Sequence, residues 1–380
     1  DHIVQTPAAG RSEESIGGMA EEKQLTAKAW AVEDGKLGML TQKDVSLPPL
    51  KPQDVEVKII CSGVCSSDLA AVHGKFPKAA YPFPIFPGHE GVGVVTEVGS
   101  EVKHVAKGDR VGLGVYRYGC KACIACTNGK DNLCPSKVLM YMLNNVGSFS
   151  THCRISSQYA FKIPDSIESE HAGPLMCAGL TTFAPFIEHD IEPGSKIGIV
   201  GIGGLGHLSI QFASKWGCEV FALSGSKHKE DSVKKLGAHH FVNTRIDGAL
   251  KKLTGKLDYI MMTASGPKVD WAGMINALAP GGKLILMGIN APTPVPIPLL
   301  SLILGQRAIV GSAAGSSGVA TKMLKFAAFH GIKPMVEKFP FKEINEVIKK
   351  VAAGKVMYRA VCVHEGNDSQ AVEADEKNDS

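Results

Sequence analysis

The chain has 380 residues, 44% hydrophobic and 21% charged, so it is long enough for about two or three globular domains. Its 41 basic and 37 acidic residues leave a formal charge of +4, which argues against a nucleic-acid partner. No apolar run approaches the length of a membrane helix, so no membrane partner is expected. The 10 cysteines are too few for a disulfide scaffold of this length, and several are grouped closely in the chain.

The two ends of the chain differ from its body. Residues 1–24 are expected to form a flexible extension, and residues 365–380 an acidic, solvated tail. The first 24 residues contain no hydrophobic segment of a secretory signal, and reduced cysteines are typical of the cell interior. The sequence therefore predicts a cytoplasmic protein, with organellar targeting by the extension left open.

Short strands with frequent glycine and proline dominate the first half of the body. Between Leu25 and Ile163, alternation of apolar and polar residues predicts strands at Asp54–Cys61, Gly91–Val98 and Arg110–Val115. This pattern favours a β-rich domain.

Beyond Ser195, short apolar strands alternate with helix-length segments, which predicts an α/β fold with a parallel, doubly wound sheet. The expected strands are Lys196–Val200, Glu219–Leu223, Tyr259–Met262, Lys283–Met287 and Ala308–Val310. The expected helices between them are Leu205–Trp216, Lys227–Leu236 and Val269–Leu278, the last ended by Pro280-Gly281-Gly282. The final part should return to the first domain as helices Val319–Phe329 and Phe341–Ala353 and strand Arg359–His364.

A glycine-rich turn joins the first of these strands to the first helix. The turn fits the pattern G-x-G-x-x-G, whose glycines allow a tight turn and close approach of the backbone to a pyrophosphate. The expected dinucleotide contacts here are Gly201, Gly203, Gly204, Leu205 and Gly206. A glycine-rich turn without a ligand is the alternative.

The end of the second strand indicates which dinucleotide binds. A site for NAD has a carboxylate there for the ribose hydroxyl, but none follows Leu223. Hydroxyl and ammonium groups, which suit a 2′-phosphate, come instead from Ser224, Ser226, Lys227 and Lys229. The sequence therefore predicts NADP(H), with an ordinary polar helix start as the alternative.

Four cysteines form a local cluster with the spacing C-x2-C-x2-C-x7-C, namely Cys120, Cys123, Cys126 and Cys134. Four thiolates close a tetrahedron around Zn²⁺ and leave no open position, which is typical of a structural site. An iron–sulfur cluster, the alternative for four thiolates, usually has other spacings.

A second set of metal-ligating side chains is spread over three segments. Cys65 lies in Gly63–Asp68, His89 and Glu90 lie in Gly88–Gly91, and Cys177 lies in Pro174–Gly179. Each residue alone is explained as well by core packing or loop structure. Their combination in this order is the informative feature.

These segments, with the four-cysteine cluster and Gly201–His207, resemble the zinc-dependent medium-chain alcohol dehydrogenases, and within them the NADP-dependent cinnamyl alcohol dehydrogenase-like branch. The resemblance spans Leu25–His364. It implies a GroES-like catalytic domain at 25–175 and 317–364, and a Rossmann NADP-binding domain at 176–316. It also implies an active site between the domains and a homodimer.

The resemblance implies a role for each residue of the second set. Cys65, His89 and Cys177 would hold a catalytic zinc, and Glu90 would either support these ligands from behind or be a transient ligand itself. With the structural site, this gives two Zn²⁺ per chain. Asp68 would orient His89, and Ser67 would relay the proton of the alcohol. The implied reaction transfers a hydride between NADP(H) and a primary alcohol/aldehyde pair, mainly towards aldehyde reduction.

The chain also departs from this branch. Ser66 and Ala70 stand where its members have histidine, and the loop Pro135–Val146, which brings Tyr141 near the cleft, is short. Phenylpropenyl aldehydes are therefore in doubt as native substrates. One alternative is a polyol dehydrogenase of the same superfamily, disfavoured because those enzymes tend to replace Cys177 with a carboxylate. A non-catalytic relative that binds zinc and NADPH is another.

Overall fold

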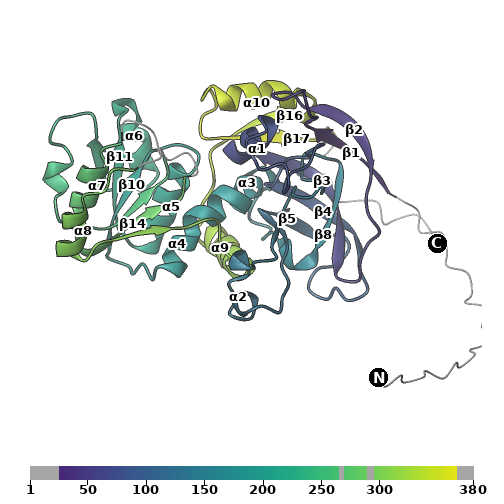
Figure 1. Cartoon of the computed structure of the whole chain (residues 1–380), viewed down its shortest axis with the longest axis horizontal. Helices are drawn as coiled ribbons and strands as arrows, with labels where there is room; N and C mark the ends of the chain where they lie inside the picture. Colours follow the sequence, from purple (N-terminus) through teal and green to yellow (C-terminus); the bar gives the residue numbers. More distant parts are fainter. Residues whose placement is uncertain (1–24, 265–268, 289–294, 366–380) are drawn as a thin grey trace, which may run out of the picture.

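The structure, a computed structural model, describes residues 25–264, 269–288 and 295–365. The expected tails, residues 1–24 and 366–380, lie outside the described residues, as do residues 265–268 and 289–294. The described chain forms two lobes, each built around its own large sheet (Figure 1). Within the described residues, no helix has both the length and the apolar character needed to cross a membrane.

The right-hand lobe of Figure 1 is built on a 7-stranded sheet with the order β16-β17-β3-β4-β5-β9, in which β8 also pairs with β3. These strands are β3 (Asp54–Val64), β4 (Gly91–Val98), β5 (Arg110–Leu113), β8 (His152–Ser156), β9 (Ala160–Lys162), β16 (Val336–Pro340) and β17 (Arg359–Val363). Two further pairs are β1 (Thr26–Ala31) with β2 (Thr41–Ser46), and β6 (Tyr116–Tyr118) with β7 (Val138–Leu139). The helices of this lobe are α1 (Ser66–Val72), α2 (Ile124–Thr127) and α10 (Ile344–Ala352). The predicted β-rich domain is therefore confirmed.

The left-hand lobe contains a 6-stranded parallel sheet with the order β12-β11-β10-β13-β14-β15. Its strands are β10 (Lys196–Val200), β11 (Glu219–Ser224), β12 (His240–Asn243), β13 (Leu257–Met262), β14 (Leu278–Leu286) and β15 (Ala308–Gly311). Its helices are α5 (Gly206–Trp216), α6 (Glu230–Lys235), α7 (Trp271–Ala277) and α8 (Leu299–Gly305). The strand order reverses between β10 and β13, as in a Rossmann fold, so the predicted doubly wound sheet is confirmed.

Some local predictions were wrong. Pro280-Gly281-Gly282 does not separate a helix from a strand, because β14 already begins at Leu278 and runs through these residues. Leu278 pairs with Leu257, and a register shift before Tyr259 accommodates the irregular stretch. Residues 227–236 split into a 3-10 turn and the short helix α6, and α8 was not predicted. The 3-10 turns are η1 (Asp131–Leu133), η2 (Ser157–Tyr159), η4 (Lys227–Lys229), η5 (Lys251–Leu253) and η6 (Phe341–Glu343).

A continuous helical segment runs between the two lobes. It consists of α3 (Ser169–Pro174), the π-helical turn η3 (Leu175–Gly179) and α4 (Leu180–Glu188). Together with α9 (Ser317–His330), it lies where the lobes meet (Figure 1). Phe183 of α4 contacts Phe212 of α5 and Phe326 of α9, with ring centroids 5.3 and 5.4 Å away. One buried hydrophobic core therefore continues from one lobe into the other. The expected bounds of the two domains remain a prediction.

Candidate active site

Three chain segments that are distant in sequence bring four metal-ligating side chains together. Cys65 precedes α1, His89 and Glu90 precede β4, and Cys177 lies in the π-helical turn η3. Their ligand atoms all lie within 4.8 Å of one another. Gly88 is needed beside them, because its φ is +100° and a Cβ there would overlap Phe149 and Ser148. The dispersed set predicted from the sequence is thus one cluster in space.

Asp68 fixes the orientation of two members of this cluster. Its side chain is fully buried, and Oδ1 accepts hydrogen bonds from His89 Nδ1 at 2.9 Å and from the Gly88 N–H at 3.0 Å. Oδ2 accepts the Cys65 N–H at 3.0 Å. Burial disfavours a charged imidazole, but the Asp68 carboxylate outweighs it and raises the pKa of His89. Since Nδ1 is occupied, Nε2 is the His89 atom left for a metal.

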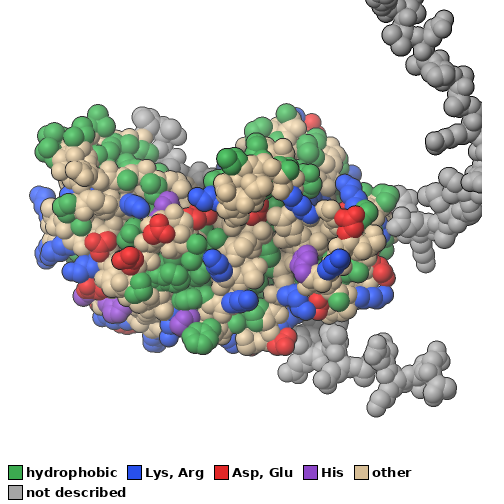
Figure 2. Space-filling model, turned by 90° about the horizontal axis from the view of Figure 1, so that it is seen from below, with side chains coloured by type: hydrophobic (Ala, Val, Ile, Leu, Met, Phe, Trp, Pro, Cys, Tyr) green, Lys and Arg blue, Asp and Glu red, His purple; other side chains and the backbone are tan. Residues whose placement is uncertain are grey.

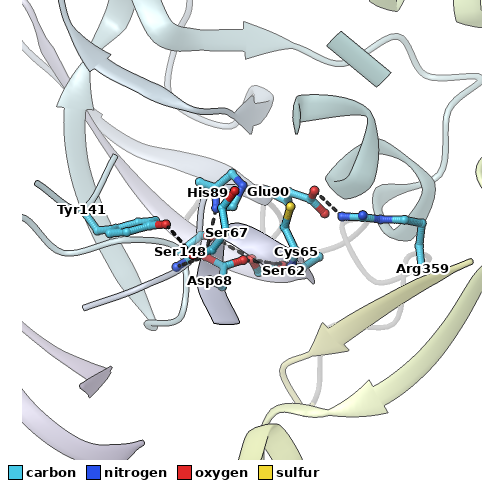
Figure 3. A network of polar contacts seen from close by, with 11 residues as sticks. Ser62, Cys65, Ser67, Asp68, His89, Glu90, Tyr141, Ser148 and Arg359 are labelled. Atoms are coloured by element: carbon cyan, nitrogen blue, oxygen red, sulfur yellow. Dashed lines mark hydrogen bonds and ion pairs between the residues drawn. The ribbon is translucent and has the colours of Figure 1, made fainter. Parts of the chain in front are cut away.

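Arg359, at the start of β17, is a residue of this site that sequence reasoning missed. Its Nη2 pairs with Oε1 of Glu90, whose side chain is fully buried (Figure 3). Oε2 of Glu90 has no hydrogen-bond partner among the described residues, and a Cβ on Gly63 would overlap it. Burial raises the pKa of Glu90 to about 7, against the opposing charge of Arg359. The only sequence signal for Arg359 was that a charged residue begins the otherwise apolar strand Arg359–Val363.

Tyr141 lies on the side of the cluster opposite Arg359, and Ser67 lies between them, next to the cluster (Figure 3). Ser67 is half-buried in the first turn of α1, and the Tyr141 hydroxyl donates to its backbone carbonyl at 3.3 Å. The ring centroids of Tyr141 and His89 are 5.9 Å apart, and Tyr141 in turn lies 5.8 Å from Tyr81. Tyr81 stacks on Phe76 at 4.6 Å. We call Phe76, Tyr81 and Tyr141 the aromatic wall.

The second cysteine cluster also assembles as the sequence predicted. The sulfur atoms of Cys120, Cys123, Cys126 and Cys134 lie within 4.8 Å of one another. The N–H of Cys123 donates to Cys120 Sγ, and backbone hydrogen bonds lower the pKa of the Cys120 thiol to about 6. Asp131 connects this segment to α9, since its Oδ1 accepts the Ser317 N–H and hydroxyl, both at 3.1 Å. The cluster suits a closed metal site that fastens a loop.

The glycine-rich turn lies between β10 and α5, at the point where the strand order reverses. Gly201 has a φ of +86°, and a Cβ there would overlap Ala264. A Cβ on Gly206 would overlap the Gly201 carbonyl, whereas one on Gly203 would meet nothing within 4 Å. A Cβ on Gly204 would lie 3.0 Å from Arg359 Cδ. The turn is therefore open at Gly203 and closely covered by Arg359 at Gly204.

The expected 2′-phosphate residues surround the end of β11. Ser224 is buried, and its Oγ accepts the Ser226 N–H at 3.2 Å. Lys227 is exposed, whereas Lys229 extends across the turn and donates to the Ile202 carbonyl at 2.7 Å. Burial lowers the pKa of Lys229. These residues thus lie together, with Lys229 already engaged by the backbone.

Comparisons with known proteins agree with this arrangement. Residues 51–165 match the family "Alcohol dehydrogenase GroES-like domain", and residues 204–328 match "Zinc-binding dehydrogenase". Aldehyde reductase AdhA of Synechocystis sp. is 39% identical over 318 residues, which cover 84% of this chain and 93% of that protein.

Two solved structures of cinnamyl alcohol dehydrogenases are also similar to this chain. A cinnamyl alcohol dehydrogenase from Sorghum bicolor has a TM-score of 0.83 and 32% identity, covering 89% of this chain and 98% of that one. A cinnamyl alcohol dehydrogenase from Helicobacter pylori, complexed with NADP(H), has a TM-score of 0.80 and 27% identity over 90% of this chain and 98% of that one.

The fold, the two cysteine-containing clusters and these matches define a zinc-binding dehydrogenase with a GroES-like domain and a Rossmann sheet. The chain belongs to the zinc-dependent medium-chain alcohol dehydrogenases, in their cinnamyl alcohol dehydrogenase-like branch. It is accordingly an oxidoreductase of alcohols and aldehydes.

Proposed function

We propose that this enzyme reduces aldehydes to primary alcohols with NADPH, at the cluster of Cys65, His89, Glu90 and Cys177. The observation that carries the proposal is the position of Arg359, which pairs with Glu90 of the metal cluster and lies against Gly204 of the dinucleotide turn. A single side chain thus connects the residues suited to a metal with the residues suited to a nicotinamide cofactor.

The donor set of the cluster fits zinc. Two sulfurs and one imidazole are a ligand set of catalytic zinc sites, which leave one position for water or substrate. Cys65, His89 and Cys177 would hold the ion, and the unpartnered Glu90 Oε2 is available as a transient ligand. When bound, zinc supplies a Lewis acid for the carbonyl oxygen and NADPH supplies the hydride. Asp68 contributes by holding the His89 ring through Nδ1.

Ser67 is the proposed proton donor to the alcohol oxygen. Its hydroxyl belongs to the same helix turn as Asp68, two residues after Cys65. Ala70 offers no imidazole for proton exchange, but Ser67 is half-buried and its neighbour Ser66 is exposed. This exposure supports recovery of the proton from solvent without a histidine relay.

The choice of NADPH over NADH rests on the end of β11. Ser224, Ser226 and Lys227 offer hydroxyl and ammonium groups there, and no carboxylate follows the strand to repel a 2′-phosphate. The complex of the Helicobacter pylori relative with NADP(H) supports the same choice. Since cells keep NADPH reduced, this preference favours aldehyde reduction as the main direction.

The aromatic wall and the aldehyde reductase relative support a broad range of aldehydes. The test is an NADPH oxidation assay with aliphatic, aromatic and α,β-unsaturated aldehydes, with mannitol and NADP⁺ as the polyol arm. Activity on aldehydes that disappears in Cys177→Ser is the expected result. Activity on mannitol alone, or activity unchanged in Cys177→Ser, would refute the proposal.

A homodimer in the cytoplasm completes the proposal. Leu299, Leu300, Ile303 and Leu304 of α8 are between 68% and 76% exposed, and β15 is the edge strand of the neighbouring sheet. Figure 2 shows hydrophobic side chains gathered at the outer end of the left-hand lobe, the lobe that carries α8 in Figure 1. Cysteine ligands need a reducing compartment, which supports the cytoplasm. Sedimentation of Leu300→Lys as a monomer would support this interface, and an unchanged dimer would refute it.

A further inference from the structure

Arg245 lies beside the residues expected to bind the 2′-phosphate, although it is outside the segment 224–229 that contains them. It follows β12, the strand that pairs in parallel with β11. Ser224, the last residue of β11, is in register with Asn243, the last residue of β12. The two strands therefore end side by side, and the residues just beyond them share one edge of the sheet.

Hydrogen bonds hold the turn after β12 against the end of β11. The Thr244 N–H donates to the Ser224 carbonyl at 3.1 Å, and the Arg245 N–H donates to Asn243 Oδ1, also at 3.1 Å. These hydrogen bonds tie the backbone at Thr244 and Arg245 to the ends of both β11 and β12. The side chain of Arg245 starts from a defined place, although it is exposed to solvent.

The side chain of Arg245 lies over Gly225, the residue between Ser224 and Ser226. A Cβ on Gly225 would lie 3.0 Å from Arg245 Nε, 3.3 Å from Cγ and 3.5 Å from Cδ. The guanidinium group therefore approaches the loop that carries the two serines. The absence of a side chain at Gly225 is what allows this approach.

The charges around this loop leave Arg245 available. Within residues 25–264, 269–288 and 295–365, no carboxylate forms an ion pair with its guanidinium, whereas Lys229 is engaged by the Ile202 carbonyl. Lys227 is the other exposed cation near the loop, and Asp247 is an exposed carboxylate two residues after Arg245. A guanidinium can bind two phosphate oxygens at once, which an ammonium cannot match in geometry.

We propose that Arg245 binds the 2′-phosphate of NADP(H) across Gly225, opposite Ser224 and Ser226, and is the main cationic determinant of cofactor choice. This inference rests on the proposed use of NADP(H) and adds to that site a residue that follows a different strand, β12. The phosphate would lie between the ends of β11 and β12, with the serine hydroxyls on one side and the guanidinium on the other.

The test separates phosphate binding from catalysis by using cofactor fragments. Binding of 2′,5′-ADP and of 5′-AMP to the zinc-loaded protein is measured by calorimetry for the wild type, Arg245→Ala, Arg245→Lys and Lys235→Ala. Lys235 is a matched control because it is an exposed cation in the last turn of α6, at the other end of that helix. Steady-state kinetics with NADPH and NADH are measured on the same four proteins.

Arg245→Ala should weaken 2′,5′-ADP about 10- to 100-fold and leave 5′-AMP unchanged, because one charge-assisted interaction is lost. Arg245→Lys should recover part of the loss, and Lys235→Ala should bind as the wild type does. Unchanged binding of 2′,5′-ADP by Arg245→Ala, or an equal loss for both fragments, would overturn the assignment of Arg245. A wild type that binds both fragments equally and uses NADH as well as NADPH would instead overturn the proposed function.

Discussion

Removing Arg359 should cost the enzyme both stability and cofactor affinity. In Arg359→Met, Glu90 remains fully buried but loses the group that neutralises it, and its Oε2 already lacks a partner. Breaking a buried ion pair in this way costs about 3–5 kcal/mol. We therefore expect the free energy of unfolding to fall by about that amount. We also expect kcat/KM for NADPH to fall about tenfold or more, since Arg359 covers Gly204 of the dinucleotide turn.

A second ion pair provides the matched control. Arg154 pairs with Glu56 at 2.7 Å, and both side chains are only 9% exposed. Arg154→Met should destabilise the protein but leave kcat/KM near that of the wild type, because neither residue belongs to the clusters or the turn. Urea unfolding of the zinc-loaded proteins, followed by tryptophan fluorescence, gives the free energies.

A double-mutant cycle with Glu90→Gln tests whether the loss of stability in Arg359→Met comes from the broken pair with Glu90. The double variant Glu90→Gln/Arg359→Met should be more stable than the sum of the single losses predicts, by about 1 kcal/mol or more, because removing both charges leaves none buried alone. Additive losses, or an Arg359→Met protein within about 1 kcal/mol of the wild type, would refute the dependence of Glu90 on Arg359.

Three further outcomes are expected. Ser67→Ala should lower kcat by about 10²- to 10⁴-fold while Ala70→Ser changes it little, and near-normal turnover of Ser67→Ala would exclude the proton-donor role. Metal analysis should find about two zinc ions per chain and about one in either Cys177→Ala or Cys120→Ala, and an unchanged zinc content in a variant would contradict its assigned site. Burial lowers the pKa of His207 to about 4, below the about 6.5 of the unfolded chain. Stability should therefore be full above pH 6.5 and fall by about 3 kcal/mol as the pH drops towards 4, and a His207→Gln protein with the same pH slope would disprove this origin.

Local patterns predicted the parts of the site that depend on spacing. The four cysteines of the closed cluster and the glycines of the turn lie in continuous segments, so their spacing alone indicates their chemistry. Five of the six strands of the parallel sheet, all except β12, were predicted because short apolar runs alternate with helix-length segments there. For Cys65, His89 and Cys177, the family pattern was needed, because no local spacing relates the three.

The rest could not be predicted because it depends on which strands become neighbours. Arg359 reaches Glu90 only because β17 pairs with β3, and Arg245 reaches Gly225 only because β12 pairs with β11. Neither pairing is encoded near the residues that it brings together. The same holds for β14, where pairing with β13 extends the strand through a proline and two glycines that locally favour a break.

The position of Arg359 has a consequence for the biosynthesis of the enzyme. Cys65, His89, Glu90 and Cys177 all emerge from the ribosome well before β17, so Glu90 meets its cation only when the chain is nearly complete. Until then, a buried Glu90 carboxylate lacks its counter-charge within the chain, which destabilises the metal-free site. We therefore expect a chain truncated before residue 359 to lack a stable site even though every zinc ligand is present, because it has lost both the counter-charge of Glu90 and the strand that pairs with β3.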